Sequence, residues 1–142
     1  MEKCLKRIKA ITETVDNREY GIRGTYDVLQ FLKDFELLDY LTEENAFVVC
    51  LNTKNKVVGY SQVAKGGVNY VNIDMKSIFK IALLTNAEKI IFIHNHPSGD
   101  TTPSKNDLEF AENLRNCCNL MGVCLLDNVI IANDNIKTLM KF

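Results

Sequence analysis

The chain has 142 residues, of which 46% are hydrophobic and 25% are charged, and its formal net charge at pH 7 is -1. These values are typical of one globular domain that buries a substantial core, and they exclude a disordered chain and a protein that binds nucleic acid by bulk positive charge. No apolar run reaches about 18 residues and the N-terminus has no apolar signal segment, so we expect neither a transmembrane helix nor secretion.

Five cysteines are present, an odd number without C-x-x-C spacing. Free thiols in a reducing cytoplasm are the simplest interpretation. Cys50 and Cys124 lie in apolar, strand-like runs and are expected to be small core residues, whereas Cys117 and Cys118 lie late in an expected helix. A cysteine as a fourth metal ligand stays open, although no spacing favours it.

The first part of the chain is expected to form two helices joined by a connector. Residues 3–14 have apolar side chains at helical spacing and predict a short amphipathic helix, which a polar connector follows over residues 15–24. Thr25 is the expected N-cap of the second helix. Its expected buried face consists of Val28, Leu29, Phe31, Leu32 and Phe35. For the Leu- and aromatic-rich residues 35–41 we expect core packing, with contact to a partner chain as the alternative.

A hairpin and a third helix are expected next. Residues 47–51 and 57–63 are β-prone and flank a polar turn, the pattern of two antiparallel strands. Residues 68–73 are also short and β-prone. Asp74 is the expected cap of a helix. The apolar positions of that helix are Ile78, Phe79, Ala82 and Leu83.

Both histidines of the chain lie together, after an expected buried strand over residues 90–93. Residues two apart in a strand point to the same side, so the imidazoles of His94 and His96 can converge on one ion. A loop then brings the chain back to Asp107, in the first turn of the next helix. Two nitrogens and one carboxylate oxygen would leave a tetrahedral zinc ion with an open position for water, whose pKa falls to about 7. The spacing therefore predicts a catalytic metal site.

The same residues also have ordinary interpretations. Ser104 and Asp107, taken alone, match a capping box at a helix start, and the two histidines could be half-exposed polar residues at a strand end. The combination His-x-His, seven residues, then Ser-x-x-Asp favours the metal. The contiguous letters His-Asn-His do not match the dispersed HNH nuclease motif, and a P-loop, a dinucleotide fingerprint and a nucleophile elbow are absent. A Cys-His peptidase is not favoured, because no cysteine lies near the histidines in sequence.

The remaining elements complete an α/β pattern. The last helix is expected to have Gly122 as its C′ residue, and its apolar residues lie at spacings of three and four: Leu108, Ala111, Leu114, Cys118 and Met121. Residues 123–126 and 129–132 predict one interrupted strand or two short ones, and residues 136–142 a terminal strand. The alternation of helices and strands indicates a βαβ-like unit with the ligands at the carboxyl end of its second strand, where open α/β sheets place their sites.

The motif His94-x-His96-x7-Ser104-x2-Asp107 resembles that of the JAMM (JAB1/MPN/Mov34) metalloproteases, and the string HNHPSGD resembles their bacterial RadC-like branch. The similarity includes residues 47–56 and 122–132. It implies an α/β (α+β) fold with a mixed central sheet flanked by helices, the JAB1/MPN-like, cytidine-deaminase-like three-layer architecture. On this basis we expect a RadC-like JAB/MPN domain over residues 21–142 and an N-terminal helical extension over residues 1–20, without the helix-hairpin-helix region of full-length RadC proteins.

The resemblance also implies roles for the residues of the motif. His94, His96 and Asp107 would bind one Zn²⁺ ion per chain. Ser104 would stabilise the oxyanion that forms on the substrate carbonyl. A glutamate on an earlier strand would take a proton from the zinc-bound water.

The expected base is the point where this chain departs from the family pattern. Asn45 occupies the usual glutamate position, and an amide cannot act as a base. We expect Glu44 to act as the base instead of the usual glutamate. A shift of one residue along a strand turns a side chain to the other face, so this role requires a bulged or irregular strand start. The alternative is that Glu43 and Glu44 are solvated residues before a strand. Asn128 is a second departure, because the family commonly has histidine there.

Three functional hypotheses remain. The first is a zinc-dependent hydrolase of JAMM type that cleaves a peptide or isopeptide amide. The second is a JAB-fold binding or scaffold module that holds a metal but lacks a working base, which Asn45 favours. The third is a DNA-associated accessory protein, since the family label carries a link with DNA repair and mobile elements. The sequence leaves the substrate and the oligomeric state open, with a dimer among the alternatives, and we expect no membrane partner.

Overall fold

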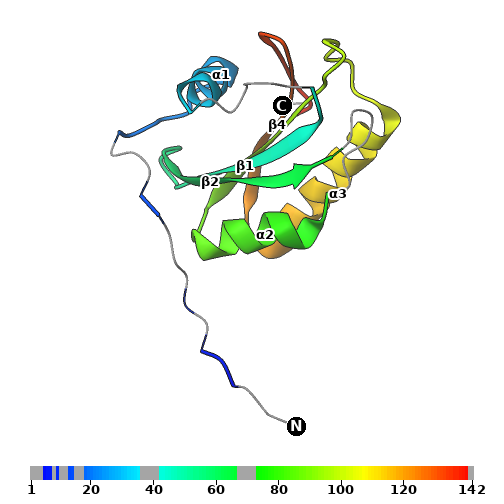
Figure 1. Ribbon diagram of the computed structural model, residues 1–142. Coiled ribbons are helices and arrows are strands. Elements are labelled where there is room, and N and C mark those ends of the chain that lie inside the picture. The colour runs from blue at the N-terminus through cyan, green and yellow to red at the C-terminus, as the bar shows by residue number, and fades with distance from the viewer. Residues whose placement is uncertain are drawn as a thin grey trace.

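A five-stranded mixed sheet, in the order β2-β1-β3-β4-β5, forms the centre of the computed structural model (Figure 1). The structure describes residues 5–7, 9, 13–14, 18–35, 42–66 and 73–140. The strands are β1 (Asn45–Leu51), β2 (Val57–Lys65), β3 (Lys89–Asn95), β4 (Cys124–Ala132) and β5 (Asn135–Thr138). β3 and β4 are parallel, and the other neighbouring pairs are antiparallel. The predicted mixed sheet and the predicted hairpin are confirmed.

Helices cover both faces of this sheet and give three layers (Figure 1). α1 (Thr25–Asp34) packs on one face, and α2 (Met75–Leu84) and α3 (Lys105–Met121) pack on the other. Alternation along each strand supplies side chains to both layers, and β3 is buried throughout residues 90–95. A strand that is covered on both faces has no solvent-exposed side that would need polar residues, which explains the continuous apolar run in the sequence.

The parallel pair β3 and β4 places the histidines at one edge of the sheet. α3 connects these two neighbouring strands, so β3–α3–β4 is the βαβ unit of the structure, and the histidines lie at the carboxyl end of its first strand. The prediction had placed them at the end of a second strand. The β-prone residues 68–73 lie outside the described residues except for Ile73, which is not in a strand.

Most of the predicted helix ends are confirmed. Asp74 caps α2 by accepting a hydrogen bond from the backbone N–H of Lys76 at 3.0 Å. Gly122 ends α3 with φ 71°, in the left-handed region that glycine adopts without strain. The prediction for Thr25 is wrong, because Thr25 is the first helical residue of α1 and Gly24 is its N-cap, with no side-chain hydrogen bond to the helix.

The helix predicted over residues 3–14 is not found where this stretch is described. Residues 5–7, 9 and 13–14 have no regular secondary structure, and the side chain of Leu5 is fully exposed. A short amphipathic helix gains most of its stability from packing its apolar face, and Leu5 has no surface to pack on. Residues 35–41, with core packing as the expectation and a partner contact as the alternative, lie outside the described residues except for Phe35, which packs against the core beneath α1.

Several apolar residues of the predicted helices, and one cysteine that was predicted to lie in the core, are exposed. Leu108 and Met121 lie at the margin of the α3 stripe that packs on the sheet, because that stripe is formed by Phe110, Leu114, Cys117 and Cys118. Leu83 lies in the last turn of α2 and is 55% exposed. Cys124 is exposed at the first position of β4, whereas Cys50 is fully buried as predicted.

The C-terminal part of the sheet also differs in detail from the prediction. β4 is one strand with a register irregularity in its pairing with β3, which agrees with the predicted interrupted strand. β5 ends at Thr138, shorter than the predicted strand over residues 136–142. Within the described residues, no helix has both the length and the apolar character needed to cross a lipid bilayer.

Candidate metal centre

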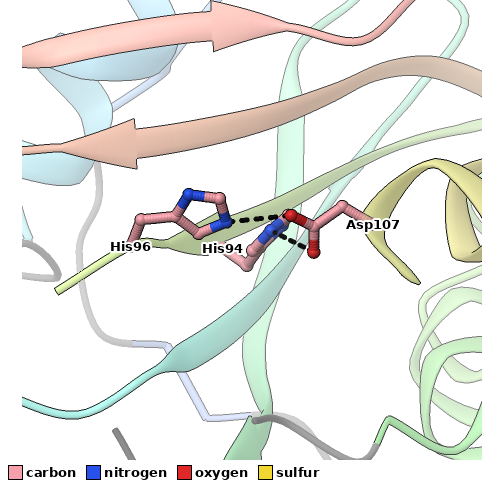
Figure 2. Close-up of side chains that lie close together, drawn as sticks. All are labelled: His94, His96 and Asp107. Carbon is pink, nitrogen blue, oxygen red and sulfur yellow. Dashed lines mark hydrogen bonds and ion pairs between the residues drawn. The ribbon is translucent and has the colours of Figure 1, made fainter. Parts of the chain in front are cut away.

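The two histidines lie where β3 ends. His94 is the sixth residue of β3, and His96 follows the strand with its backbone N–H donating to the carbonyl of Ile131 on β4 at 2.8 Å. This bond continues the strand geometry through His96, so both imidazoles project to the same side, with ring centroids 5.2 Å apart. The predicted convergence of the two rings is therefore present (Figure 2).

Asp107 approaches the same point from the first turn of α3. Ser104 is the N-cap of α3, and its Oγ accepts a hydrogen bond from the Asp107 backbone N–H at 3.0 Å. In return, Asp107 Oδ2 accepts from the Ser104 backbone N–H at 2.8 Å, which completes a capping box. The cap fixes the rotamer of Asp107 and turns its carboxylate toward the histidines. Asp107 can therefore cap the helix and face the histidines at the same time, so the two interpretations of this residue do not exclude each other.

The ligand atoms have a spacing that suits a metal ion. His94 Nε2 lies 3.2 Å from Asp107 Oδ1, and His96 Nε2 lies 3.0 Å from Asp107 Oδ2 (Figure 2). Zinc with bonds of about 2.0–2.1 Å in tetrahedral geometry separates its ligand atoms by about 3.3 Å. Among the described residues, these three are the only group of His, Cys, Asp or Glu side chains in which one ligand atom from each lies within 4.8 Å of the others.

Within the part of the chain that the structure describes, His94 has no hydrogen bond that would occupy its ring nitrogens, so both are free to bind another group. The residue is 6% exposed, and neither ring nitrogen has a hydrogen-bond partner among the described residues. The 3.2 Å approach to Asp107 is close enough for an ion pair but is not oriented as a hydrogen bond. A buried imidazole without partners is costly unless something binds it. The arrangement of His94 therefore fits a metal ligand.

His96 is oriented by the loop that follows it. Its Nδ1 lies 2.8 Å from the carbonyl oxygen of Asp100. A carbonyl oxygen can only accept, so Nδ1 carries the proton of that bond and the lone pair of the neutral ring lies on Nε2, facing Asp107. The loop returns through Gly99, which has φ 84° and whose backbone N–H donates to the His96 carbonyl at 3.2 Å. The bond from His96 Nδ1 to the Asp100 carbonyl is of the kind that usually orients a metal-binding histidine.

The charge of Asp107 is secured by its surroundings. Partial burial alone would raise the pKa of this carboxyl group, but the contact with His94 and the hydrogen bonds with Ser104 outweigh it, so the pKa lies well below its ordinary value. Asp107 therefore stays a carboxylate throughout the neutral range and needs no deprotonation before it binds a cation.

Glu44 lies next to β1 on the side of the histidines. Ala46 pairs with His94 in a regular β1–β3 register, and alternation from Ala46 assigns Glu44 to the same face. The Glu44 carbonyl accepts from the Gly66 backbone N–H at 3.0 Å, which continues the β1–β2 ladder through this residue. The β1–β3 pairing is regular, whereas the β1–β2 pairing has a register irregularity between Ala46 and Phe47, so the start of β1 is irregular on one side, as expected.

The electrostatic environment of Glu44 agrees with this placement. Partial burial raises the pKa of the Glu44 carboxyl group, the charges of His94 and His96 act in the opposite direction, and the charge of Asp107 raises it further. The carboxyl group is therefore near enough to interact with all three side chains of the candidate centre.

Asn45, at the expected glutamate position, has other contacts. Its Oδ1 accepts from Gln62 Nε2 at 2.8 Å, and its Nδ2 donates to the Glu43 carbonyl at 3.0 Å. Asn95 was missed in the sequence, although it holds this segment: its Oδ1 accepts from the Asn45 backbone N–H at 2.6 Å, and its Nδ2 donates to the same Glu43 carbonyl at 3.0 Å. A polar residue between two histidines at the end of a buried strand was the one available signal.

Comparison with known proteins places this centre in a family. The model of the RadC-like JAB domain matches residues 22–141. Similar curated relatives are UPF0758 proteins of Clostridium beijerinckii (42% identical over 137 residues, 96% of this chain and 57% of that protein), Bacillus pumilus (39% over 127 residues, 89% and 55%) and Caldanaerobacter subterraneus (35% over 120 residues, 84% and 51%). The chain thus spans somewhat more than half the length of these relatives. Since the family model covers most of the chain, including the candidate metal centre, this protein belongs to the RadC-like JAB domain family.

Proposed function

We propose that this protein is a zinc-dependent hydrolase of JAMM type that cleaves a peptide or isopeptide amide bond. The observation that carries the proposal is the convergence of three ligand atoms, two imidazole nitrogens and one carboxylate oxygen, at one partly buried point. Three protein ligands that leave a position for water are the pattern of a catalytic zinc site. A zinc ion bound there would polarise a substrate carbonyl and lower the pKa of a water molecule to about 7.

Glu44 is the proposed general base. A carboxylate whose pKa is raised by burial is a better proton acceptor near neutral pH than an exposed one. From the face that it shares with His94, Glu44 would take a proton from the attacking water and deliver it to the leaving amine. Glu43, its neighbour, is assigned by alternation to the opposite face of the sheet, and its carboxylate lies 3.5 Å from Lys65 Nζ.

Ser104 is the proposed donor to the developing oxyanion. Its Oγ accepts from the Asp107 N–H, and the hydroxyl group retains its own proton to donate. The residue is exposed at the start of α3, next to the ligand Asp107, so a substrate carbonyl can reach it. A fixed donor of this kind contributes about 10²–10³-fold to the rate of acyl transfer.

The proposal is tested by zinc content together with turnover. Purified protein should hold about one zinc ion per chain by mass spectrometry, and should cleave members of a library of fluorogenic peptide amides and lysine-isopeptide-linked peptides. Glu44→Gln should retain the zinc and lose about 10²–10⁴-fold in kcat. The matched control Glu43→Gln should keep both zinc and kcat. A wild-type protein that binds no zinc after reconstitution contradicts the proposal.

A binding or scaffold module is the second candidate, and the presence of Asn45 at the expected glutamate position favours it. In that case zinc would bind but Glu44→Gln would change no reaction rate. A link with DNA stays a prediction from the family label. Fluorescence anisotropy with duplex DNA at low and high salt tests it, because binding through phosphate contacts weakens steeply as salt rises.

A further inference from the structure

Asn128 is a buried amide on the same face of the sheet as His94. It pairs with Phe92 on the neighbouring strand β3, and two residues further along His94 pairs with Ile130. Ile90 pairs with Leu125 but Ile91 pairs with Asp127, so one extra residue of β4 enters the ladder before Asn128. A bulge of one residue reverses which side chains face each layer, and this one places Asn128 on the face of Phe92 and His94.

The side chain of Asn128 is unsatisfied in this position. The residue is 1% exposed, and neither Oδ1 nor Nδ2 has a hydrogen-bond partner within the described part of the chain. Only its backbone is engaged, with the carbonyl accepting from the Leu139 N–H at 2.7 Å. A buried amide without partners is rare, because its desolvation is not compensated. Something in the working protein is expected to hydrogen-bond to it.

His94 also has a buried ring nitrogen without a hydrogen-bond partner among the described residues. Its Nε2 faces Asp107, whereas its Nδ1 is buried and unpartnered. The other imidazole of the centre has its outer nitrogen bound to a carbonyl, as His96 Nδ1 is to Asp100. Asn128 and His94 are diagonal neighbours on adjacent strands, about 8 Å apart at their Cα atoms given the usual strand spacings. At that Cα spacing the two side chains share one face, and a single water with two hydrogen bonds is within the reach of both.

We propose that Asn128 is a positioning residue for His94, acting through one buried water that accepts a hydrogen bond from His94 Nδ1–H and donates one to Asn128 Oδ1. This contact fixes the tautomer of His94 with the Nε2 lone pair directed to the metal position. The inference rests on the proposed function to the extent that His94 is taken as a metal ligand.

The test compares zinc affinity with the stability of the zinc-free protein. Asn128→Leu replaces the amide by an apolar group of similar size and leaves the buried His94 Nδ1–H without its partner, so the zinc-free protein should melt at a lower temperature than the wild type. Its dissociation constant for zinc, measured by competition with a chromophoric chelator, should rise about 10–100-fold, as for other outer hydrogen-bond partners of ligands. Asn128→Asp keeps an acceptor oxygen at the same place and should restore the affinity. Ile130→Val, which alters only packing opposite His94, is the matched control and should bind zinc as the wild type does.

The ring proton of His94 gives a direct readout. The chain has two histidines, so imidazole ¹⁵N spectra of the zinc-loaded protein contain two rings. In the wild type the Nδ1–H of His94 should exchange slowly with water, and in Asn128→Leu it should exchange fast, whereas the His96 signal stays unchanged. An unchanged zinc affinity in Asn128→Leu overturns the inference, and so does an equal loss in Ile130→Val.

The two proposals fail in different ways. If wild-type protein binds no zinc, the hydrolase proposal fails, and a crystal structure of the zinc-free protein decides the inference. A water within hydrogen-bond distance of both His94 Nδ1 and Asn128 Oδ1 supports it, and the absence of such a water from a well-defined map overturns it. The same crystal structure decides the case in which Asn128→Leu does not fold.

Discussion

Replacement of Asp107 separates the helix cap from the proposed binding of a metal, which share one carboxylate. Asp107 Oδ2 accepts from the Ser104 backbone N–H and also lies 3.0 Å from His96 Nε2. Asp107→Asn keeps an oxygen for the cap but removes the negative charge, and Asp107→Ala removes both. We therefore expect both variants to lose zinc and only the alanine variant to lose the cap.

The size of each effect follows from the structure. Both variants lose the charge of Asp107, but Asp107→Asn keeps an amide that can accept the cap bond, so without metal it should be more stable than Asp107→Ala by about 1 kcal/mol or more. In a chain of this length that corresponds to about 3 °C in Tm, with Asp107→Ala the lower of the two. Zinc at 100 times its Kd should stabilise the wild type by about 2.7 kcal/mol, or about 8 °C, and neither variant should respond.

Scanning calorimetry in EDTA and in excess zinc measures both quantities, and zinc content per chain serves as an independent check. A zinc-dependent rise in the Tm of Asp107→Asn as large as that of the wild type would refute Asp107 as a ligand. Equal Tm values of the two variants in EDTA would refute the argument about the cap.

Three further predictions concern the loop, the acid limit and the thiols. Gly99→Ala should cost about 1–2 kcal/mol of unfolding free energy in urea titrations, because φ is 84° and the new Cβ would lie 3.0 Å from Asn133 Nδ2; a stability equal to the wild type would contradict this. The pKa of Asp107 is lowered in the folded state, so its stabilisation is complete above the unfolded pKa of about 3.9 and is lost as the pH falls through the folded value. Zinc-free wild type should accordingly lose more stability on acidification than Asp107→Asn, and parallel acid-unfolding curves would count against it. Iodoacetamide at pH 8 should modify the exposed Cys124 well before Cys118, whose pKa is raised to about 12 by burial and by its thiol neighbours; peptide mass spectrometry that finds equal rates would disprove it.

The convergence of the candidate ligands could be predicted from the sequence because its geometry is local. His94 and His96 are two residues apart in a strand, and Asp107 is three residues after a capping serine, so regular secondary structure alone brings them near each other. The core faces were predicted less well, because the stripe of α3 that packs on the sheet depends on how the helix is rotated against β3 and β4. A periodic sequence allows several neighbouring rotations, and tertiary packing selects one of them.

The residues around the ligands were harder to predict, because their roles depend on strand register. The position of Glu44 follows from the pairing of Ala46 with His94, and the position of Asn128 follows from an extra residue in β4. A shift of one residue in either strand would turn these side chains to the α1 face. Local patterns do not specify such a shift, so the sequence left open both the facing of Glu44 and any role for Asn128.

The capping box explains how the candidate centre can be arranged before an ion binds. Asp107 has its rotamer fixed by two hydrogen bonds with Ser104, and His96 has its ring fixed by the carbonyl of Asp100. Side chains that are already ordered lose little further conformational entropy on binding, so more of the interaction energy remains as affinity. His94 is the one member of the trio without such an outer contact among the described residues. The preorganisation of the centre is therefore complete only if a group reaches His94 Nδ1, and Asn128 is the buried side chain on an adjacent strand that has unused hydrogen-bonding capacity.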